Sequence, residues 1–325
     1  MADVFAESVT VSTSARLHFG FLDPSGRGSR PFGSFGLALD RPETTLTLRR
    51  AQTFTVTGRE ADRAERYLRR MVSYLDVKEA PLGPYALNIS EAIPPHAGLG
   101  SGTQLALAVG SAFAKLEGFR MMPRDVASYL GRGGRSGIGI AAFEQGGAVL
   151  DSGPLDGALP QLVARVPFPA AWRVLLILDP GAQGLTGPDE VEAFQALPDF
   201  PERETAELRR RIVEVALPAL AEEDFSTFCR EIANLQAHMA AYFGPRQGGA
   251  YVSPLVADAL TWLAGKGLTG LGQSSWGPTG FAFVVSETEA KALLDEIRRE
   301  SRFSGLKFEL ARGRNEGAIV IRNID

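Results

Sequence analysis

The sequence predicts an α+β protein of two domains. The chain has 325 residues, a length that suggests about two domains at roughly 100–200 residues each. Its first half opens with β-branched segments of period two, which are typical of strands. Its second half reads as a strand, several long helices, a strand, a helix and two strands. That order favours helices covering one face of a mostly antiparallel sheet.

The predicted elements of the first half follow from local pattern. Alternation predicts strands at Val4–Thr13 and Thr44–Thr57, and periodicity predicts a helix at Arg59–Leu75. A strand is expected at Tyr85–Ser90, and the Ala- and Leu-rich stretch Ser101–Leu116 predicts a helix. Prolines 154, 160, 167 and 169 interrupt any sustained period and mark a boundary, giving domains 1–155 and 170–325.

The second half begins with the apolar run Arg173–Leu178, which predicts a buried strand. Amphipathic periods then predict helices at Glu202–Leu217, Glu222–Phe243, Pro254–Ala264 and Glu287–Ser301. The remaining expected strands are Phe281–Val285, Leu306–Ala311 and Ala318–Arg322.

Composition excludes several classes of protein. The single cysteine, Cys229, allows no internal disulfide, no Cys-rich zinc cluster and no Fe–S site. The three histidines lack metal-site spacing. A net charge of -4, with the basic residues dispersed, gives no signal for nucleic acid or an anionic membrane. The residues from Met1 to Val11 do not resemble a signal peptide, and no run of about 18 apolar residues occurs, so we expect a cytoplasmic protein.

Glycine is enriched and clustered, with 36 residues giving about 11% against an average near 7%. One cluster, within Pro94–Gln104, lies between a predicted strand and a predicted helix. Backbone N–H groups and the helix dipole make such a turn a pocket for anions. The alternative is a glycine-rich helix start capped by Ser101 or Thr103. No Gly-Lys-Ser/Thr follows, so this is not a Walker A motif.

The segment Pro94-x-x-x-Gly98-Leu99-Gly100-Ser101 resembles the phosphate loop of the GHMP superfamily, named for galactokinase, homoserine, mevalonate and phosphomevalonate kinases. The segment Gly270–Gly280 looks like that superfamily's third motif. The resemblance implies a GHMP-kinase-like fold, with an N-terminal domain like ribosomal protein S5 domain 2, a ferredoxin-like C-terminal domain and an active site between them.

Two departures count against a kinase. The kinases usually carry a second Ser after Gly-Leu-Gly-Ser, where this chain has Gly102. Many of them also carry an Asp that deprotonates the attacking hydroxyl, and Gly139 stands at the corresponding position. Glycine has no side chain with which to act as a base.

The chain more closely resembles a non-kinase branch, the β-ribofuranosylaminobenzene 5'-phosphate synthases. The matching segments are Ala15–Asp23, Gly98–Gln104 and Arg135–Glu144. The resemblance implies condensation of phosphoribosyl pyrophosphate with 4-aminobenzoate or 4-hydroxybenzoate, releasing pyrophosphate and CO2, in tetrahydromethanopterin biosynthesis. It also suggests a homodimer.

Such a reaction deprotonates no hydroxyl but must neutralise three anionic groups, which calls for backbone N–H groups, Mg²⁺ and cations. Candidate cations in the glycine clusters are Arg16, His18, Arg27, Arg30, Arg132 and Arg135. Arg16 and His18 alternate with Leu17 and Phe19 and so share one strand face. A hydrogen-bonded core histidine is the alternative for His18, and at least two of Arg27, Arg30 and Arg132 are expected to be solvated. His96 lies beside the loop, whereas His238 is expected to be structural.

The resulting site hypothesis has four parts. Catalytic roles fall to Arg16, His18 and Arg135, and Asp23 is the candidate Mg²⁺ ligand, with a turn-forming Asp as the alternative. The phosphate-binding residues are Gly98, Leu99, Gly100, Ser101, Gly102 and Thr103. The substrate-binding residues are Ser136, Gly137, Gly139, Ser274, Ser275 and Trp276, where Trp276 either stacks on the aryl ring or anchors its loop.

The sequence is also compatible with two other functions. The first is a small-molecule kinase of the same superfamily that uses Glu144 or Asp151 as its base. The second is a non-catalytic regulator that binds a nucleotide or sugar phosphate on this fold. ATP dependence and pyrophosphate release separate these from the synthase.

Overall fold

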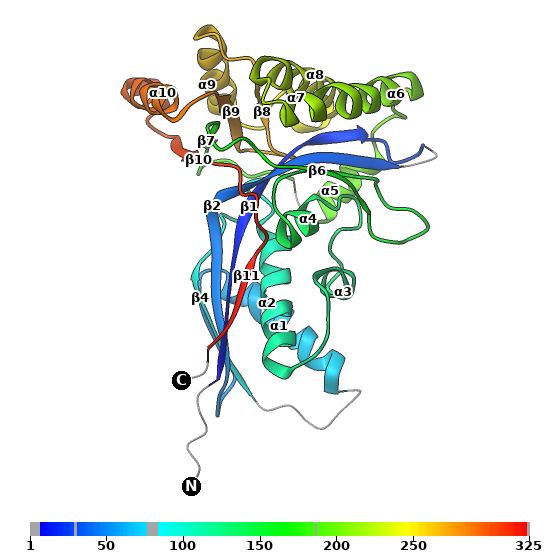
Figure 1. Cartoon of the computed structure of the whole chain (residues 1–325), viewed down its shortest axis with the longest axis vertical. Helices are drawn as coiled ribbons and strands as arrows, with labels where there is room; N and C mark the ends of the chain where they lie inside the picture. The colour runs from blue at the N-terminus through cyan, green and yellow to red at the C-terminus, as the bar shows by residue number, and fades with distance from the viewer. Residues whose placement is uncertain (1–6, 29–30, 77–83, 186, 324–325) are drawn as a thin grey trace.

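The computed structural model describes residues 7–28, 31–76, 84–185 and 187–323. Its long strands β1 (Ser8–Asp23) and β2 (Phe32–Arg50) pair antiparallel and run through the lower part of the molecule in Figure 1. The sheet has the order β11-β1-β2-β4-β3, and β5 joins β2 to β6. The other strands are β3 (Thr55–Gly58), β4 (Tyr85–Glu91), β5 (Ala148–Asp151), β6 (Leu162–Val166) and β11 (Ile319–Asn323).

Helices α1 (Ala61–Asp76), α2 (Ser101–Glu117), α3 (Pro123–Tyr129) and α4 (Ile138–Glu144) pack on this sheet. Alternate residues of the strands, such as Val9, Val11 and Leu46, are fully buried against them. The period-two pattern of the sequence therefore becomes one apolar sheet face.

The second sheet is formed by β7 (Arg173–Leu178), β8 (Leu271–Gln273), β9 (Gly280–Val284) and β10 (Lys307–Ala311) in the order β10-β7-β9-β8. All its pairings are antiparallel, which confirms the expected ferredoxin-like arrangement. Helices α9 (Pro254–Gly265) and α10 (Glu287–Arg299) cover one face, where Leu175 and Ile177 are buried.

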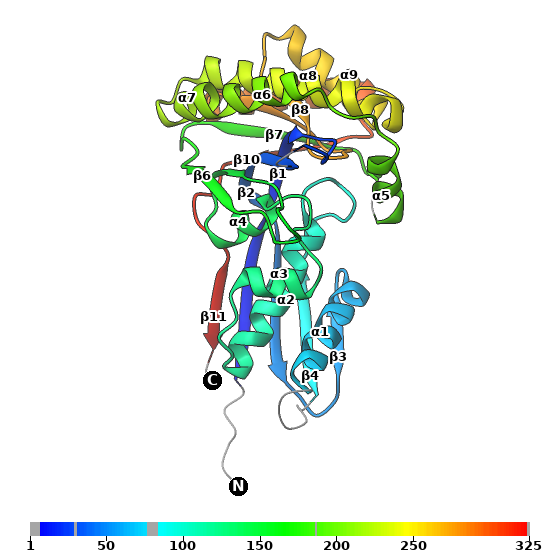
Figure 2. The ribbon, with the colours of Figure 1, turned by 90° about the vertical axis from the view of Figure 1, so that its right-hand side faces the viewer.

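The other face of the second sheet is also covered. Phe281 and Phe283 share a core with Phe228 of α8 (Phe225–Gln247) and with Phe19 and Phe35 of the first sheet. One continuous hydrophobic core therefore joins the two sheets. In Figure 2, α8 lies beside α6 (Glu202–Arg211) and α7 (Leu217–Ala221) in a helical layer across the end of the long strands.

The sequence patterns locate most of these elements. The strand at Arg173–Leu178 has the predicted bounds, and α2 begins at Ser101 as expected. The strand expected at Thr44–Thr57 is divided into β2 and β3, and β1 extends ten residues beyond Thr13. Residues 1–6, where the first predicted strand begins, lie outside the described residues. The shorter elements α3, α4, α5 (Pro188–Gln195), β5, β6 and β8 carry no clear sequence period.

The two sheets depart from the predicted domain ranges at two points. Strand β6 lies beyond residue 155 but pairs with β5 in the first sheet. Strand β11, predicted within the second domain, crosses back and pairs with β1, Thr10 opposite Ile321. Local pattern identifies a strand but not its partner, because pairing depends on the whole fold. None of the described helices is both long and apolar enough to span a membrane.

Candidate active site

A cleft lies where the start of α2, the loop before α4 and the segment 274–277 come together. It consists of two adjoining cavities of about 360 and 400 Å³. Both cavities are lined by Arg16, Thr103, Arg132, Glu190 and Ser275, so they form one continuous space. We call the larger cavity, at the start of α2, the loop half, and the other the Gly139 half.

The glycine turn between β4 and α2 forms the floor of the loop half. Gly98 and Gly100 have φ of 75° and 81°, a left-handed conformation that glycine adopts without strain. Gly100 precedes the first helical residue, and its carbonyl accepts from the backbone N–H groups of Thr103 and Gln104 at 3.1 Å. Gly98, Gly100, Ser101, Gly102 and Thr103 line the loop half at the helix N-terminus, a setting in which backbone N–H groups favour an anion.

Two predicted residues shape the turn without lining the cleft. The Leu99 side chain is buried, and its carbonyl accepts from the backbone N–H of Arg16 at 3.1 Å. The buried hydroxyl of Ser274 donates to the Gly98 carbonyl at 2.8 Å and accepts from the backbone N–H of His18 at 3.0 Å. Ser274 therefore joins the turn to β1, and Ser275 is the serine that faces the cleft.

Four arginines point their charge toward this space. Arg16, Arg132 and Arg135 were predicted, and Arg63 of α1 joins them in the loop half. Arg16 donates from Nη1 to the Gly98 carbonyl at 2.6 Å, so it also holds the turn. Burial lowers the pKa of Arg16 to about 10, which Glu190 partly opposes, and the guanidinium stays charged at neutral pH.

Glu190 of α5 is the one carboxylate among the described residues that line the cleft. Its Oε2 lies 2.7 Å from Nη2 of Arg135. The Arg135 guanidinium also lies over the ring of Phe194, 4.6 Å from its centroid. The lining thus has four cationic side chains and one anionic side chain, a balance suited to anionic ligands.

His18 lies between the cleft and a smaller cavity of about 30 Å³. Its side chain is 3% exposed, and its ring lies 4.6 Å from that of Phe21. Neither ring nitrogen has a hydrogen-bond partner among the described residues. Burial, reinforced by the charges of Arg16 and Arg135, lowers the pKa of His18 to about 3. His18 is therefore a neutral imidazole without the hydrogen bonds expected of a structural core histidine.

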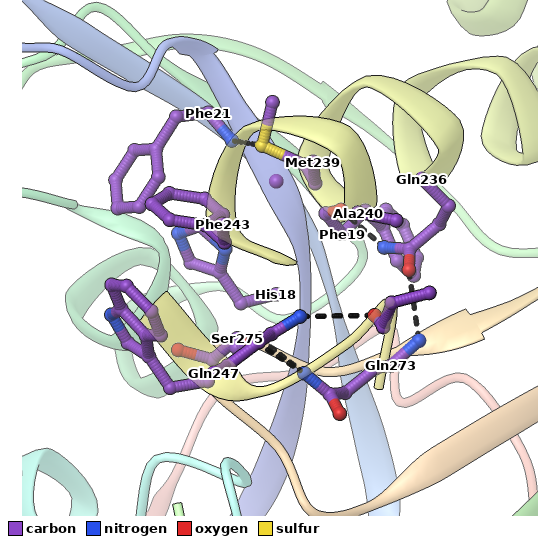
Figure 3. Close-up of a pocket in the computed structure, with 13 residues that line it drawn as sticks. His18, Phe19, Phe21, Gln236, Met239, Ala240, Phe243, Gln247, Gln273 and Ser275 are labelled. Carbon is purple, nitrogen blue, oxygen red and sulfur yellow. Dashed lines mark hydrogen bonds between the residues drawn. The ribbon is translucent and has the colours of Figure 1, made fainter. Parts of the chain in front are cut away.

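Trp276 separates the same two spaces, and Figure 3 shows the small cavity with His18, Phe21, Met239 and Phe243 around it. The Trp276 ring lies 4.5 Å from that of Phe243 and 5.3 Å from that of Phe194, centroid to centroid. No described residue accepts a hydrogen bond from its buried Nε1. Trp276 both anchors its loop by packing and contributes to the wall of the loop half.

Gly139, near the start of α4, lines the cleft opposite Thr103. A Cβ on Gly139 would lie 3.0 Å from Cγ2 of Thr103, so a side chain there would crowd the lining. Ser136 lines the same half, and its hydroxyl accepts from that of Ser34 at 2.8 Å. Gly137 lies behind it and donates its N–H to Asp151 at 2.7 Å.

The two alternative kinase bases do not face the cleft. Asp151 is buried and accepts hydrogen bonds from the backbone N–H groups of Ser34, Gly137 and Gly153 at 2.7–3.1 Å. Burial raises the pKa of Asp151, and these hydrogen bonds oppose the shift. Glu144, whose pKa is also raised by burial, lies at the end of α4 outside the lining. Neither carboxylate is placed to deprotonate a bound hydroxyl.

The expected metal ligand, Asp23, lies at the end of β1 and does not line the cleft. Its two carboxylate oxygens accept from the Ser25 hydroxyl at 2.6 Å and the Gly28 N–H at 3.0 Å. This geometry fits the alternative interpretation, a turn-forming Asp. Among the described residues, no group of three or more His, Cys, Asp or Glu side chains could hold a metal ion. Binding of Mg²⁺ through one or two carboxylates together with substrate phosphates stays a prediction.

The remaining candidates are Arg27, Arg30, His96 and His238, and of these only His96 is found in the cleft lining of the described residues. Arg27 pairs with Asp199 at the surface, at 2.5 Å, as expected of a solvated arginine, and Arg30 lies outside the described residues. His96 lines the loop half, whereas His238 bonds through Nδ1 to the Asn234 carbonyl within α8.

Sequence reasoning missed Arg63 and Glu190. Arg63 is one of many polar residues on an amphipathic helix, and Glu190 follows a Gly- and Pro-containing stretch without a period. Neither carried a local signal. Arg63 reaches the cleft because α1 packs against α2, and Glu190 reaches it because α5 lies beside the cleft.

Two family models match the chain: the GHMP kinases N terminal domain over residues 66–147 and the GHMP kinases C terminal model over residues 216–302. The chain is 28% identical to a beta-ribofuranosylphenol 5'-phosphate synthase of Methanothermobacter thermautotrophicus, over 96% of this chain and 98% of that protein. It is 31% identical to a beta-ribofuranosylphenol 5'-phosphate synthase of Archaeoglobus fulgidus, over 84% of this chain and 87% of that protein.

Among solved structures, the homoserine kinase from Cytophaga hutchinsonii resembles the chain with a TM-score of 0.66. The two share 17% identity, and the match covers 99% of both chains. At that identity the likeness concerns the fold, and it agrees with the two-sheet architecture described above.

Proposed function

The chain belongs to the beta-ribofuranosylphenol 5'-phosphate synthase family within the GHMP superfamily, and we propose that it joins the ribose of phosphoribosyl pyrophosphate to a 4-substituted benzoate, with release of pyrophosphate and CO2. It is an enzyme of the transferase class. The finer assignment makes it a decarboxylating phosphoribosyltransferase of tetrahydromethanopterin biosynthesis. The relatives are named for a ribofuranosylphenol, the type of product that 4-hydroxybenzoate would give; 4-aminobenzoate is the other substrate we propose.

One observation carries this proposal. The cleft combines the glycine turn with four arginines, while glycine stands at the position of the kinase base. Both substrates are anions, and their reaction needs charge neutralisation but no general base for a hydroxyl. The cleft's cation-rich lining supports that chemistry better than phosphoryl transfer.

We assign the pyrophosphate to the loop half, against Gly100, Ser101 and the guanidinium groups of Arg16, Arg63 and Arg132. The benzoate then occupies the Gly139 half, where Phe21 and His18 offer ring faces and Arg135 offers a cation. A glycine at position 139 leaves space for an aromatic ring beside Thr103.

The reaction balances without an external base. The bond between the anomeric carbon and pyrophosphate breaks, and the loop half stabilises the negative charge that develops on the leaving group. The ring carbon that bears the carboxylate forms the new C–C bond. Loss of CO2 then returns its bonding electrons to the ring and restores aromaticity. The neutral imidazole of His18 adds no second positive charge beside that of Arg135.

The kinase alternative is not favoured, because Asp151 serves as a hydrogen-bond acceptor for the start of α4 and Glu144 lies outside the cleft. The regulator alternative is likewise not favoured beside relatives that are synthases. A requirement for Mg²⁺, a homodimer and a cytoplasmic location stay predictions drawn from the resemblance and the sequence.

Incubation of the purified protein with phosphoribosyl pyrophosphate and carboxyl-labelled 4-hydroxybenzoate or 4-aminobenzoate tests the proposal. We expect pyrophosphate and labelled CO2 in equal amounts, without ATP. A kinase would require ATP and release no CO2, and a regulator would release neither product. Running the two benzoates in parallel identifies the preferred 4-substituent.

A further inference from the structure

The start of α2 is covered by two guanidinium groups. A Cβ on Gly102 would overlap Nη2 of Arg132 and would lie 3.0 Å from Nη2 of Arg63. Only a glycine at this second helical position leaves both groups where they are. The two arginines come from the loop before α4 and from α1, so residues far apart in sequence meet at this point.

The guanidinium groups of Arg132 and Arg63 lie close together at Gly102, and few carboxylates balance their positive charge. Among the described residues the side chain of Arg132 has no ion pair or hydrogen bond, and its buried Nε has no partner; its guanidinium lies 5.9 Å from the centroid of the Tyr67 ring. Arg63 bonds Glu60 through its other terminal nitrogen, Nη1, at 3.3 Å. The helix N-terminus adds its own partial positive charge. Like charges so close together repel, and an anion between them would relieve that repulsion.

The place they occupy is the one where the related kinases carry a second serine that helps to hold metal and phosphate. Gly102 has no side-chain oxygen to offer a metal, and Glu190, the one carboxylate among the described residues that line the cleft, pairs with Arg135 at 2.7 Å. A guanidinium offers a planar fork of N–H donors that matches phosphate oxygens and needs no coordination geometry. With Gly in place of Ser at position 102, the guanidinium groups of Arg132 and Arg63 occupy the space where the kinases hold a metal ion.

We propose that Arg132 and Arg63, seated on Gly102, form a diphosphate clamp that binds the pyrophosphate group without a divalent ion held by the protein. The identity of the ligand rests on the proposed function, but diphosphate binding can be measured independently of catalysis. Both arginines contact the ligand in this proposal and contribute to its affinity. Any Mg²⁺ in the reaction would then enter with the substrate.

Calorimetric titration of the whole protein with inorganic pyrophosphate, in EDTA and in Mg²⁺, tests the clamp. We expect binding in EDTA, with an affinity that Mg²⁺ changes by less than about threefold. Replacement of Arg132 by Gln should weaken metal-free binding by about tenfold or more, the size of effect typical of a charged hydrogen bond. Arg120→Gln, at the exposed loop beyond the other end of α2, removes the same charge and should bind as the parent does.

Gly102→Ser is the sharper variant because it restores the kinase pattern. The overlap involves the flexible tip of Arg132, which can move, so the fold should persist. We expect metal-free affinity to fall about tenfold and Mg²⁺ to restore part of it.

Two results would overturn the clamp: pyrophosphate binding by the parent protein only in Mg²⁺, or unchanged metal-free affinity in Gly102→Ser. The first comparison needs no variant and therefore decides the matter even if a variant fails to fold. Metal-free pyrophosphate binding by a protein that releases no CO2 from either benzoate would leave the clamp standing and refute the synthase assignment.

Discussion

The guanidinium of Arg135 and the carboxylate of Glu190 meet across the cleft, with Nη2 and Oε2 2.7 Å apart. Arg135 belongs to the loop before α4, which packs on the first sheet. Glu190 belongs to α5, which follows β7 of the second sheet, so the ion pair joins two segments that are distant in the sequence. Their side chains are 32% and 24% exposed, which makes this ion pair partly desolvated. An anionic substrate that approaches Arg135 has to compete with Glu190.

Replacement of Glu190 by Gln should therefore strengthen benzoate binding. The neutral amide still accepts a hydrogen bond from Arg135 but competes less for its charge. We expect the KM for the benzoate to fall about three- to tenfold, given the modest strength of partly exposed ion pairs. Steady-state kinetics at fixed phosphoribosyl pyrophosphate measures this.

Glu192→Gln is the matched control, because Glu192 is exposed on the same helix and outside the cleft lining. Its KM should equal that of the parent. A raised KM in Glu190→Gln would contradict the competition and would indicate that the carboxylate positions Arg135.

His18 should make the fold sensitive to acid. Burial and neighbouring positive charge hold its pKa at about 3 against 6.5 in the unfolded chain. Below pH 6.5 the unfolded chain binds a proton that the folded protein does not bind, so stability is lost as the pH falls from 6.5 toward 3. The contribution is fully present above pH 6.5.

Calorimetric Tm values at pH 7, 5.5 and 4.5 test this for the parent and for His18→Phe. The variant removes the titrating group, so its Tm should fall less over that interval. Identical slopes for the two proteins would show that His18 titrates alike in the folded and unfolded states.

Arg16 has two functions that a variant can separate. It holds the Gly98 carbonyl at 2.6 Å, and it faces both halves of the cleft. In Arg16→Gln the loss of a charged hydrogen bond to substrate should cost about 1.5–3 kcal/mol, or roughly ten- to hundred-fold in kcat/KM. Arg49→Gln, an exposed arginine of β2, provides the charge-matched control.

The outcome depends on comparing activity with stability. A substrate role predicts that kcat/KM falls far more than the free energy of unfolding can explain at the assay temperature. If instead the lost activity simply follows the unfolded fraction, Arg16 acts only on the turn at Gly98.

Several of these residues could be placed from the sequence because their signals are local. The turn at Gly98–Thr103 combines positive-φ glycines with a helix start, and α2 begins at Ser101 as the pattern predicts. Arg16 and His18 alternate with apolar residues, and that spacing places both on β1 beside the cleft. The fold class followed from the order of strands and helices, which local periodicity reports well.

Other features could not be predicted, because they depend on packing between distant segments. Arg63 reaches Gly102 only because α1 lies against α2. Asp23 ends the strand that carries Arg16 and His18, yet its carboxylate accepts hydrogen bonds from Ser25 and Gly28 in the turn that follows. The pairing of β11 with β1 likewise joins the two ends of the chain, about which a local pattern carries no information.

Gly139 decides between the synthase and the kinase interpretations. Its carbonyl accepts a hydrogen bond from the buried Gln104 at 2.7 Å, which fixes the start of α4 beside Thr103. In Gly139→Asp the new Cβ meets Thr103, and its carboxylate faces a space that we assign to an anionic substrate. Like charges in a partly desolvated cleft repel. We expect a folded protein with at least about tenfold lower kcat/KM, equivalent to roughly 1.4 kcal/mol, and without kinase activity.

Gly139→Asn separates the two causes, because it has nearly the same shape without the charge. Both variants should lose activity through crowding at Thr103, and Asp should lose more through repulsion. Equal losses would assign the whole effect to crowding, and full turnover by Gly139→Asp would place residue 139 away from the reacting carbon. ATP-dependent phosphorylation of a small alcohol by the unmodified protein would be the most damaging result. It would mean that another residue of the cleft acts as the base, and that a glycine at position 139 does not exclude a kinase.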